Sequence, residues 1–267
     1  MKGRKRTELI IIDPQNDFCN SKGSLFVPGA TEDMDRVAEM INRIGKDLFD
    51  IHVTLDSHHY VDIAHPIFWI DGSGKHPNPF TIISAKDVED GKWHAANPQF
   101  FGRSLEYVQK LDQNDRYLLC IWPPHCLIGS WGYSVHKPLY TALLRWEEDF
   151  AMVDYVTKGS NFWTEHYSAV QADVPDPQDP GTQLNARLIE TLEEADEILI
   201  TGEALSHCVA NTITDIANNF GDDNISKFTL LTDASSNVSG FEDLGKKFVN
   251  DMTKRGMMVS KTTDINL

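Results

Sequence analysis

The chain has 267 residues, of which 41% are hydrophobic, and a formal charge of −16 at pH 7. This length and apolar content are enough for one sizeable core. Nucleic-acid-binding proteins need a positive surface, so the acidic balance argues against a nucleic-acid partner. No apolar run approaches the roughly 20 residues that span a bilayer, so we expect no membrane partner. Four cysteines in a chain of this length do not indicate a disulfide scaffold.

Strand-like apolar runs alternate with amphipathic stretches along the chain. The expected strands cover residues 8–12, 51–55, 117–121, 152–156, 197–201 and 227–231. Apolar residues at helical spacing predict helices over residues 31–48 and 240–255, and a further helix is expected to begin near Gln183. The alternation predicts an α/β fold, a three-layer α/β/α domain with a mostly parallel sheet.

We interpret residues 1–267 as a single domain with an insertion at about residues 66–116. The insertion contains turn signals at residues 71–74 and 76–79, followed by residues 80–83, which could form a strand. A lid and an oligomer contact are two roles for such a segment. A surface excursion without a role is the third reading.

Asp13 follows the first expected strand and begins a turn that runs from Pro14 to Asp17. Open parallel sheets bind ligands along the edge where the carboxyl ends of their strands lie. A carboxylate at this edge can therefore face a reactive group, although capping the turn is the structural alternative.

A candidate metal-ligand set follows the next two expected strands. Asp56 and His58 are two residues apart and can point the same way from an extended chain. With His65 and His125 they form a mixed oxygen and nitrogen set suited to zinc, manganese or iron rather than calcium. His59 is a rival ligand, but it would point to the opposite face because it directly follows His58.

Lys158 and Cys208 follow two later strands. A lysine at a strand end is most simply a solvated surface residue. Cys208 opens an expected helix, where unpaired backbone N–H groups favour a thiolate and can hold an oxyanion. A lysine ammonium about 4 Å from the sulfur would stabilise its thiolate by up to roughly 4 kcal/mol at an effective dielectric near 20. The alternative for Cys208 is a small buried packing residue.

Five separated motifs occur in order along nearly the whole chain and resemble the nicotinamidases of the isochorismatase-like cysteine hydrolase superfamily. They are DPQNDF at residues 13–18, DSH at 56–58, WPPHCLIG at 122–129, KG at 158–159 and GEALSHCV at 202–209. The resemblance implies a catalytic triad of Asp13, Lys158 and Cys208. It also implies the metal ligands Asp56, His58, His65 and His125, a cis peptide between Glu203 and Ala204, and an oxyanion hole formed by the N–H groups of Ala204 and Cys208.

The implied reaction converts nicotinamide to nicotinate and ammonia through a thioester. Cys208 would attack the carboxamide, and Asp13 would accept the thiol proton and pass it to the departing ammonia. One divalent metal ion, expected to be zinc with iron or manganese as alternatives, would position the ring. Phe18 and Trp122 could sandwich a flat ring, with Phe162 and Trp163 as further walls, although core packing is the other role of such aromatic residues.

Other readings stay open at the level of the sequence. The chain could be a cysteine amidase for another small carboxamide, a hydrolase in which metal-bound water attacks, or a ligand-binding relative without catalysis. The resemblance implies a place in pyridine nucleotide salvage and NAD metabolism. A reactive thiol favours a reducing, cytoplasmic location, and a homo-oligomer is compatible with the insertion.

Overall fold

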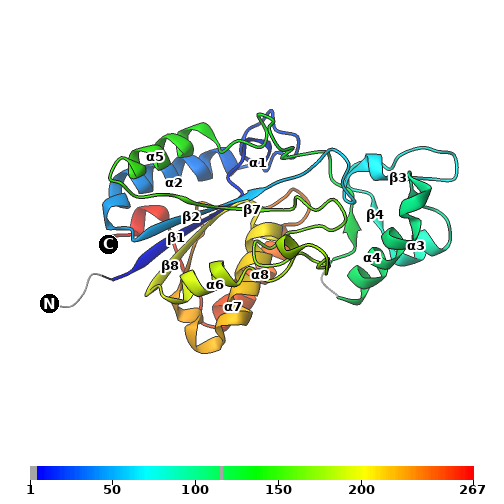
Figure 1. Cartoon of the computed structure of the whole chain (residues 1–267). Helices are drawn as coiled ribbons and strands as arrows, with labels where there is room; N and C mark the ends of the chain where they lie inside the picture. Colours follow the sequence, from blue (N-terminus) through cyan, green and yellow to red (C-terminus); the bar gives the residue numbers. More distant parts are fainter. Residues whose placement is uncertain (1–4, 115–116) are drawn as a thin grey trace.

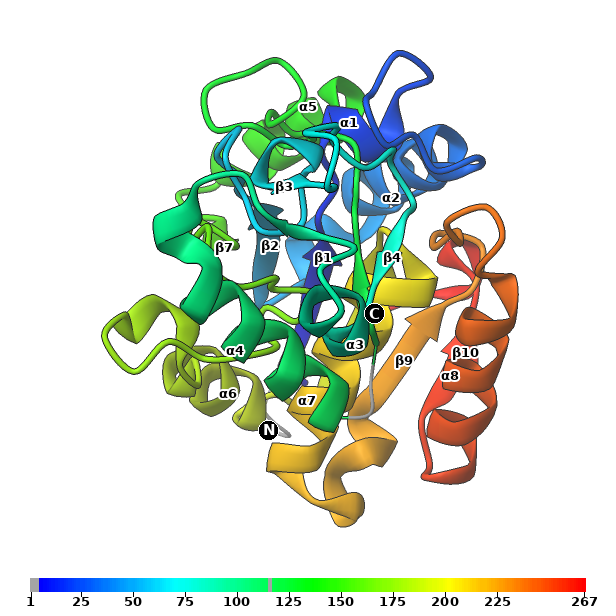
Figure 2. The same cartoon turned by 90° about the vertical axis from the view of Figure 1, so that its right-hand side faces the viewer.

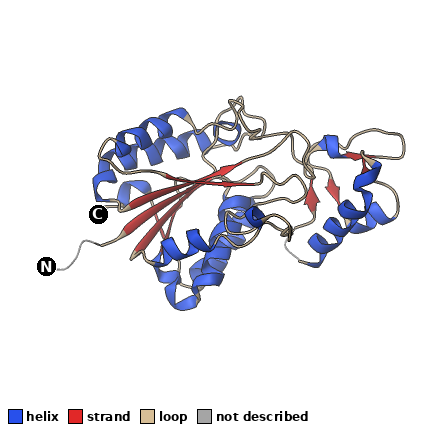
Figure 3. Cartoon of the chain, viewed as in Figure 1, coloured by secondary structure: helices blue, strands red, loops and turns tan. Residues whose placement is uncertain are grey.

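Six parallel strands form one central sheet, as the computed structural model of residues 5–114 and 117–267 shows. Their order across the sheet is β10 (Met258–Ser260), β9 (Phe228–Leu231), β8 (Glu197–Gly202), β1 (Thr7–Ile12), β2 (Asp50–Asp56) and β7 (Asp154–Lys158). In Figure 3 this sheet lies between two layers of helices. The predicted three-layer α/β/α fold is therefore confirmed.

The central strands are apolar because both faces of the sheet are covered. All six residues of β1 are buried, and Leu9 lies opposite Ile51 of β2 and Leu199 of β8. Strands of buried parallel sheets read as continuous hydrophobic runs for this reason. Five predicted strands begin and end within two residues of their observed bounds. The short edge strand β10, which is half exposed, lacks such a run and was not predicted.

The helices cover the two faces unequally (Figure 1). The first face carries α2 (Ala30–Ile44) and α5 (Lys137–Glu147), and the second carries α6 (Ala186–Glu193), α7 (Ala210–Phe220) and α8 (Glu242–Lys254). A short helix, α1 (Asn16–Cys19), follows β1. No helix in the described part of the chain has both the length and the apolar character needed to cross a bilayer.

The predicted insertion lies beyond the carboxyl ends of the central strands (Figures 1 and 2). It contains α3 (Ala85–Glu89), α4 (Phe101–Gln113), and the antiparallel pair β3 (Trp69–Ile70) and β5 (His94–Ala95). A second antiparallel pair joins β4 (Ile82–Ile83) to β6 (Leu119–Cys120). Residues 115 and 116, at the end of the predicted insertion, lie outside the described residues.

The prediction of a strand over residues 117–121 in the main sheet is wrong. Within this range only Leu119–Cys120 forms a strand, and it pairs with β4 of the insertion rather than with the central sheet. The backbone of Ile121 is also bonded to the insertion, because its N–H donates to Thr81 O at 2.9 Å and its carbonyl accepts from Phe80 N at 2.5 Å. The insertion supplies the hydrogen-bond partners that a neighbouring parallel strand would otherwise have supplied.

Candidate active site

Three side chains from separate elements meet at the carboxyl edge of the central sheet. Asp13 directly follows β1, Lys158 is the last residue of β7, and Cys208 lies in a π-helical turn, Leu205–Val209, that leads into α7. The Lys158 ammonium lies 2.9 Å from Asp13 Oδ2 and 3.7 Å from Cys208 Sγ. All three side chains are buried. The structure therefore brings together the three residues of the predicted triad.

The Lys158 ammonium is held by four groups. Besides Asp13 and Cys208, it contacts Asp56 Oδ1 at 3.0 Å and the carbonyl oxygen of His166 at 2.9 Å. Burial disfavours the charged form, but Asp13 and Asp56 outweigh this effect and hold the pKa of Lys158 well above its usual value. Lys158 therefore stays protonated and acts as a fixed positive charge.

Cys208 rests as a thiol rather than as the thiolate that a nearby lysine alone would favour. Burial raises the pKa of Cys208 well above its usual value, and the Lys158 ammonium offsets only part of this shift. Asp13, whose pKa burial raises and Lys158 lowers, is the carboxylate on the other side of that ammonium. A base is therefore needed to activate the sulfur, and Asp13 is placed to be that base.

Asp56, His58 and His125 form a buried cluster whose candidate ligand atoms all lie within 4.8 Å of one another. The Nε2 atoms of His58 and His125 lie 3.0 and 3.3 Å from Asp56 Oδ2. The Nδ1 atom of His58 contacts Asp62 Oδ2 at 3.0 Å, and that of His125 contacts Pro123 O at 2.9 Å. With an acceptor at Nδ1, each ring can present Nε2 to the cluster as a metal ligand.

The ring of His65 lies beside this cluster, although its ligand atoms do not meet the same distance limit. Its ring centre lies 5.1 Å from that of His58 and 5.6 Å from that of His125. Its Nδ1 contacts Tyr60 O at 3.2 Å, whereas its buried Nε2 has no partner among the described residues. Burial lowers the pKa of His65 to about 4, so the ring is neutral, which is the metal-binding form. The rival ligand His59 is exposed.

This donor set fits a divalent transition metal. It offers one carboxylate and two imidazoles, with the ring of His65 beside them and Asp62 behind His58 in the carboxylate–histidine arrangement that orients metal ligands. The unpartnered Nε2 of His65 is a buried polar atom whose lone pair a metal would use.

We expect the Asp62→Asn substitution to weaken metal binding by roughly 10- to 100-fold, because an amide can donate to His58 Nδ1 and favour the wrong tautomer. Competition with a chromophoric chelator measures the affinity. Substitution of the exposed Asp149 with asparagine removes the same charge and should leave the affinity unchanged. Equal affinities for the two variants would show that Asp62 does not orient His58.

Two side chains near the start of the chain hold in place the segments that carry Asp56 and His125. The Gln15 amide donates to the Asp56 carbonyl and accepts from the Asp56 N–H, both at 2.7 Å. Asp17 Oδ2 accepts the Cys126 N–H at 2.7 Å and so fixes the residue after His125. Both lie in the motif at residues 13–18, but the sequence does not show which backbone groups they bind.

A cavity of about 30 Å³ lies beside Cys208, and Phe18, Trp122, His125 and Ala204 are among the residues that line it. This space has room for about one or two water molecules and is small compared with a six-membered ring. A pyridine ring therefore enters only if the wall side chains move. The structure places two of the four predicted aromatic residues, Phe18 and Trp122, at this cavity.

The other two aromatic residues lie elsewhere. Phe162 and Trp163 pack against Phe100 of the insertion, at ring-centre distances of 6.0 and 4.7 Å, and the Arg103 guanidinium lies 4.3 Å above the Trp163 ring. Neither lines the cavity beside Cys208. We therefore leave Phe162 and Trp163 out of the proposed ring pocket.

Glu165, His166 and His207 are among the cavity residues that were not sequence candidates. Burial raises the pKa of Glu165 to about 8, and its Oε1 lies 3.9 Å from His58 Nε2. Burial lowers the pKa of His207 to about 4 and that of His166 to about 3, so both rings are neutral. Their only sequence signal is their position close to Lys158 and Cys208.

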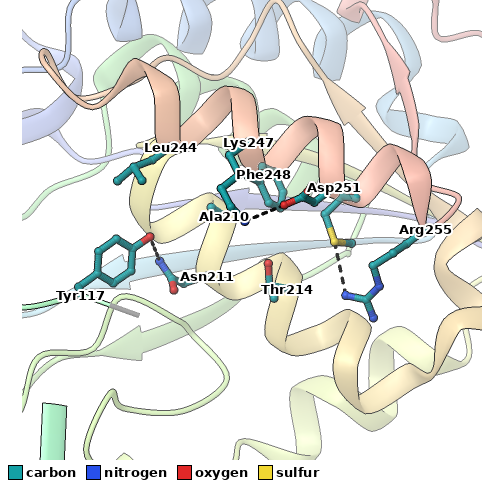
Figure 4. Close-up of a pocket in the computed structure, with 10 residues that line it drawn as sticks. Tyr117, Ala210, Asn211, Thr214, Leu244, Lys247, Phe248, Asp251 and Arg255 are labelled. Atoms are coloured by element: carbon teal, nitrogen blue, oxygen red, sulfur yellow. Dashed lines mark hydrogen bonds and ion pairs between the residues drawn. The ribbon is translucent and has the colours of Figure 1, made fainter. Parts of the chain in front are cut away.

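A wider groove of about 370 Å³ lies between α7 and α8 (Figure 4). Its lysine and aspartate, Lys247 and Asp251, pair at 2.7 Å, and Asn211 donates to the Tyr117 hydroxyl at 3.2 Å. Cys208 does not line this groove. The chemistry of the side chains, rather than the size of the cavity, therefore places the candidate active site beside Cys208.

A second buried cysteine, Cys126, directly follows His125 but is not activated by that histidine. The neighbouring His125 ring uses Nδ1 for Pro123 O and turns Nε2 toward Asp56. Burial raises the pKa of Cys126 well above its usual value.

Comparison with known proteins relates the chain to one group of enzymes, although no family model matches it. It is 25% identical over 205 residues to a nicotinamidase of Saccharomyces cerevisiae, covering 76% of this chain and 78% of the yeast protein. It is 26% identical over 211 residues to an Escherichia coli nicotinamidase, covering 78% and 74% of the two chains.

Several solved structures share the fold of this chain. The yeast nicotinamidase bound to the inhibitor nicotinaldehyde matches with a TM-score of 0.67 at 21% identity, over 96% of this chain and 99% of the other. The pyrazinamidase of Pyrococcus horikoshii in complex with zinc matches with a TM-score of 0.56 at 17% identity, over 96% and 99%. An isochorismatase family protein of Desulfovibrio vulgaris shares the fold, with a TM-score of 0.54. The chain is therefore similar in sequence to nicotinamidases, and it shares its fold with solved nicotinamidase, pyrazinamidase and isochorismatase-family structures.

Proposed function

We propose that this protein hydrolyses nicotinamide to nicotinate and ammonia. The observation that carries the proposal is the Lys158 ammonium held between Asp13 and Cys208, beside the buried Asp56, His58 and His125 cluster. Relatives named nicotinamidases and the fold match to a nicotinamidase that binds nicotinaldehyde support this choice of substrate.

The first half of the reaction forms a thioester. Asp13 accepts the Cys208 proton, and the sulfur attacks the carboxamide carbon while Lys158 holds both groups in place. The N–H groups of Ala204 and Cys208 receive the developing oxyanion, and each such donor contributes roughly 2.7–4 kcal/mol to transition-state stabilisation. The C–N bond then breaks, Asp13 returns its proton to the nitrogen, and ammonia leaves.

The second half restores the enzyme. Asp13 takes a proton from water, the hydroxide attacks the thioester carbon, and the C–S bond breaks. The proton on Asp13 passes to the departing sulfur, which regenerates the thiol and leaves nicotinate. One carboxylate serves as base and acid in both halves, so the net reaction consumes only water.

The proposed metal ligands are Asp56, His58, His65 and His125, and zinc best suits them, with iron or manganese as alternatives. When bound, the metal supplies an open position for a ring nitrogen. Phe18 and Trp122 then flank the ring and orient the carboxamide toward Cys208. A buried, reactive thiol also suits a reducing compartment, so we place the enzyme in the cytoplasm.

Ammonia release from nicotinamide tests the proposal. We expect release by the metal-loaded protein, loss after chelation and recovery when metal is returned. Benzamide, which has the same shape but no ring nitrogen, should be turned over roughly 100-fold less efficiently or worse. Absence of release from folded, metal-loaded protein would rule the proposal out. Equal turnover of the two amides would indicate a cysteine amidase for other small carboxamides.

A further inference from the structure

Two buried carboxyl groups meet behind the candidate oxyanion hole. Glu203 follows the last residue of β8 and directly precedes Ala204, and Asp33 projects from the first turn of α2. Their exposed fractions are 0% and 3%. Both side chains contact Ser236, because Glu203 Oε2 accepts its N–H at 3.1 Å and Asp33 Oδ2 accepts its hydroxyl at 2.5 Å, so the two acids lie close together. Two ionised carboxylates at such a buried position would repel each other, which favours a proton on one of the two groups.

The remaining contacts assign that proton to Glu203. Asp33 accepts the Arg36 guanidinium at 2.7 Å and the Ser236 hydroxyl at 2.5 Å, both of which favour its ionised form. Glu203 Oε2 accepts the Ser236 N–H at 3.1 Å. Glu203 Oε1, which is buried, accepts no hydrogen bond from the described residues. An oxygen that bears a proton and donates it to Asp33 has this pattern.

The acid pair reaches Ala204 through the backbone of Ser236. The Ser236 N–H binds the Glu203 carboxyl, and the Ser236 carbonyl accepts the Leu205 N–H at 2.7 Å. Ser236 therefore binds the residues on both sides of Ala204. The Ser236 hydroxyl ties the same residue to Asp33, so the geometry around the Ala204 N–H depends on the contact between the two acids.

The groups that face Glu203 do not favour its charge. Asp33 approaches Glu203 from α2, and Cys19 approaches it from α1. Burial raises the pKa of the Cys19 thiol well above its usual value, so neither neighbour supplies a positive charge. Arg36 pairs with Asp33 rather than with Glu203, and its side chain is 40% exposed. Burial, and then Asp33, raise the pKa of Glu203 well above its usual value.

We infer that neutral Glu203, hydrogen-bonded to Asp33 and Ser236, is a positioning residue that holds the Ala204 N–H where it receives the oxyanion. The inference rests on the proposed function. Ionised Glu203 would face ionised Asp33 at close range, and their repulsion would push apart the two acids that hold Ser236. A neutral glutamine can accept the Ser236 N–H and donate to Asp33, so it should replace the protonated acid.

Thermal unfolding tests the protonation state without any assay of activity. The unfolded chain ionises Glu203 above its ordinary pKa of about 4.3, whereas the folded chain keeps the proton up to the raised pKa. Wild-type protein therefore loses stability relative to Glu203→Gln as pH rises through this window. We expect the gap in Tm to widen by roughly 3 °C per pH unit from about pH 5 upward. Glu39→Gln, at an exposed site on α2, removes the same charge and should show no such gap.

Ammonia release tests the positioning role at pH 7. Glu203→Leu, which cannot accept the Ser236 N–H, should lower kcat by roughly 100-fold with little change in KM, and Glu203→Gln should rescue it. Parallel Tm curves for wild type and Glu203→Gln would overturn the inference, whether or not Glu203→Leu folds. So would equal kcat losses in both variants. A wild-type protein that releases no ammonia while the Tm gap still widens would reject the proposed function and leave the protonated acid pair standing.

Discussion

Replacement of Cys208 with alanine is expected to lower ammonia release by at least about 10⁴-fold, because knocking out the nucleophile of a hydrolase removes the covalent route itself. The side chain is small and buried, and alanine fills most of its space without adding a polar group. Steady-state release from nicotinamide by matched, metal-loaded preparations measures the effect.

Cys126→Ala is the matched control, since Cys126 is also buried and also lies near the metal cluster. It should keep most of the activity. Retained activity in Cys208→Ala would instead favour attack by metal-bound water, and loss only in Cys126→Ala would assign the nucleophile to that residue.

Asp13→Asn should lower kcat/KM by roughly 10²- to 10⁴-fold, the range that general acid–base catalysis contributes. Asparagine cannot accept the thiol proton, yet Lys158 keeps its contact with Asp56 at 3.0 Å, so the ammonium stays paired and the fold should survive. Metal content and the unfolding midpoint, measured beside the rate, separate loss of the base from loss of the site.

The pH profile gives a second test of Asp13. The base must be ionised, so kcat/KM of the wild-type protein should rise with pH through the pKa of Asp13. Burial raises that pKa, and Lys158 counteracts only part of the shift, so the rise should lie above the usual range of an aspartate. In Asp13→Asn this acidic limb should disappear. An unchanged limb would assign it to another group.

The sequence located the site because three of its residues lie at or shortly after the carboxyl ends of strands. The apolar runs before Asp13, Lys158 and Cys208 predict parallel strands, and the carboxyl ends of parallel strands share one edge. Their convergence in the structure follows from topology alone. The proposed metal ligands were also selected as residues that follow expected strands, although the stretch before His125 does not join the central sheet. Only the structure shows that Nε2 of His65 has no partner among the described residues.

The features that the sequence did not reveal have a common cause, because the contacts that determine them join residues distant in sequence. Residues 117–121 read as a central strand, but their partners come from the insertion. Phe162 and Trp163 are suitable aromatic walls by type, but Phe100 draws them away from the cavity. A glutamate is usually exposed, and the sequence does not show that Glu203 is buried near Asp33, about 170 positions earlier.

The attachment of residues 119–121 to the insertion has a consequence for hydrogen exchange. The Ile121 amide donates to Thr81 of the insertion rather than to the central sheet. Its protection from deuterium should therefore fall together with that of the insertion, while the amides of β1 and β8 remain protected to higher denaturant. Because Ile121 directly precedes Trp122, which lines the cavity, this wall of the pocket would open with the insertion as one cooperative unit.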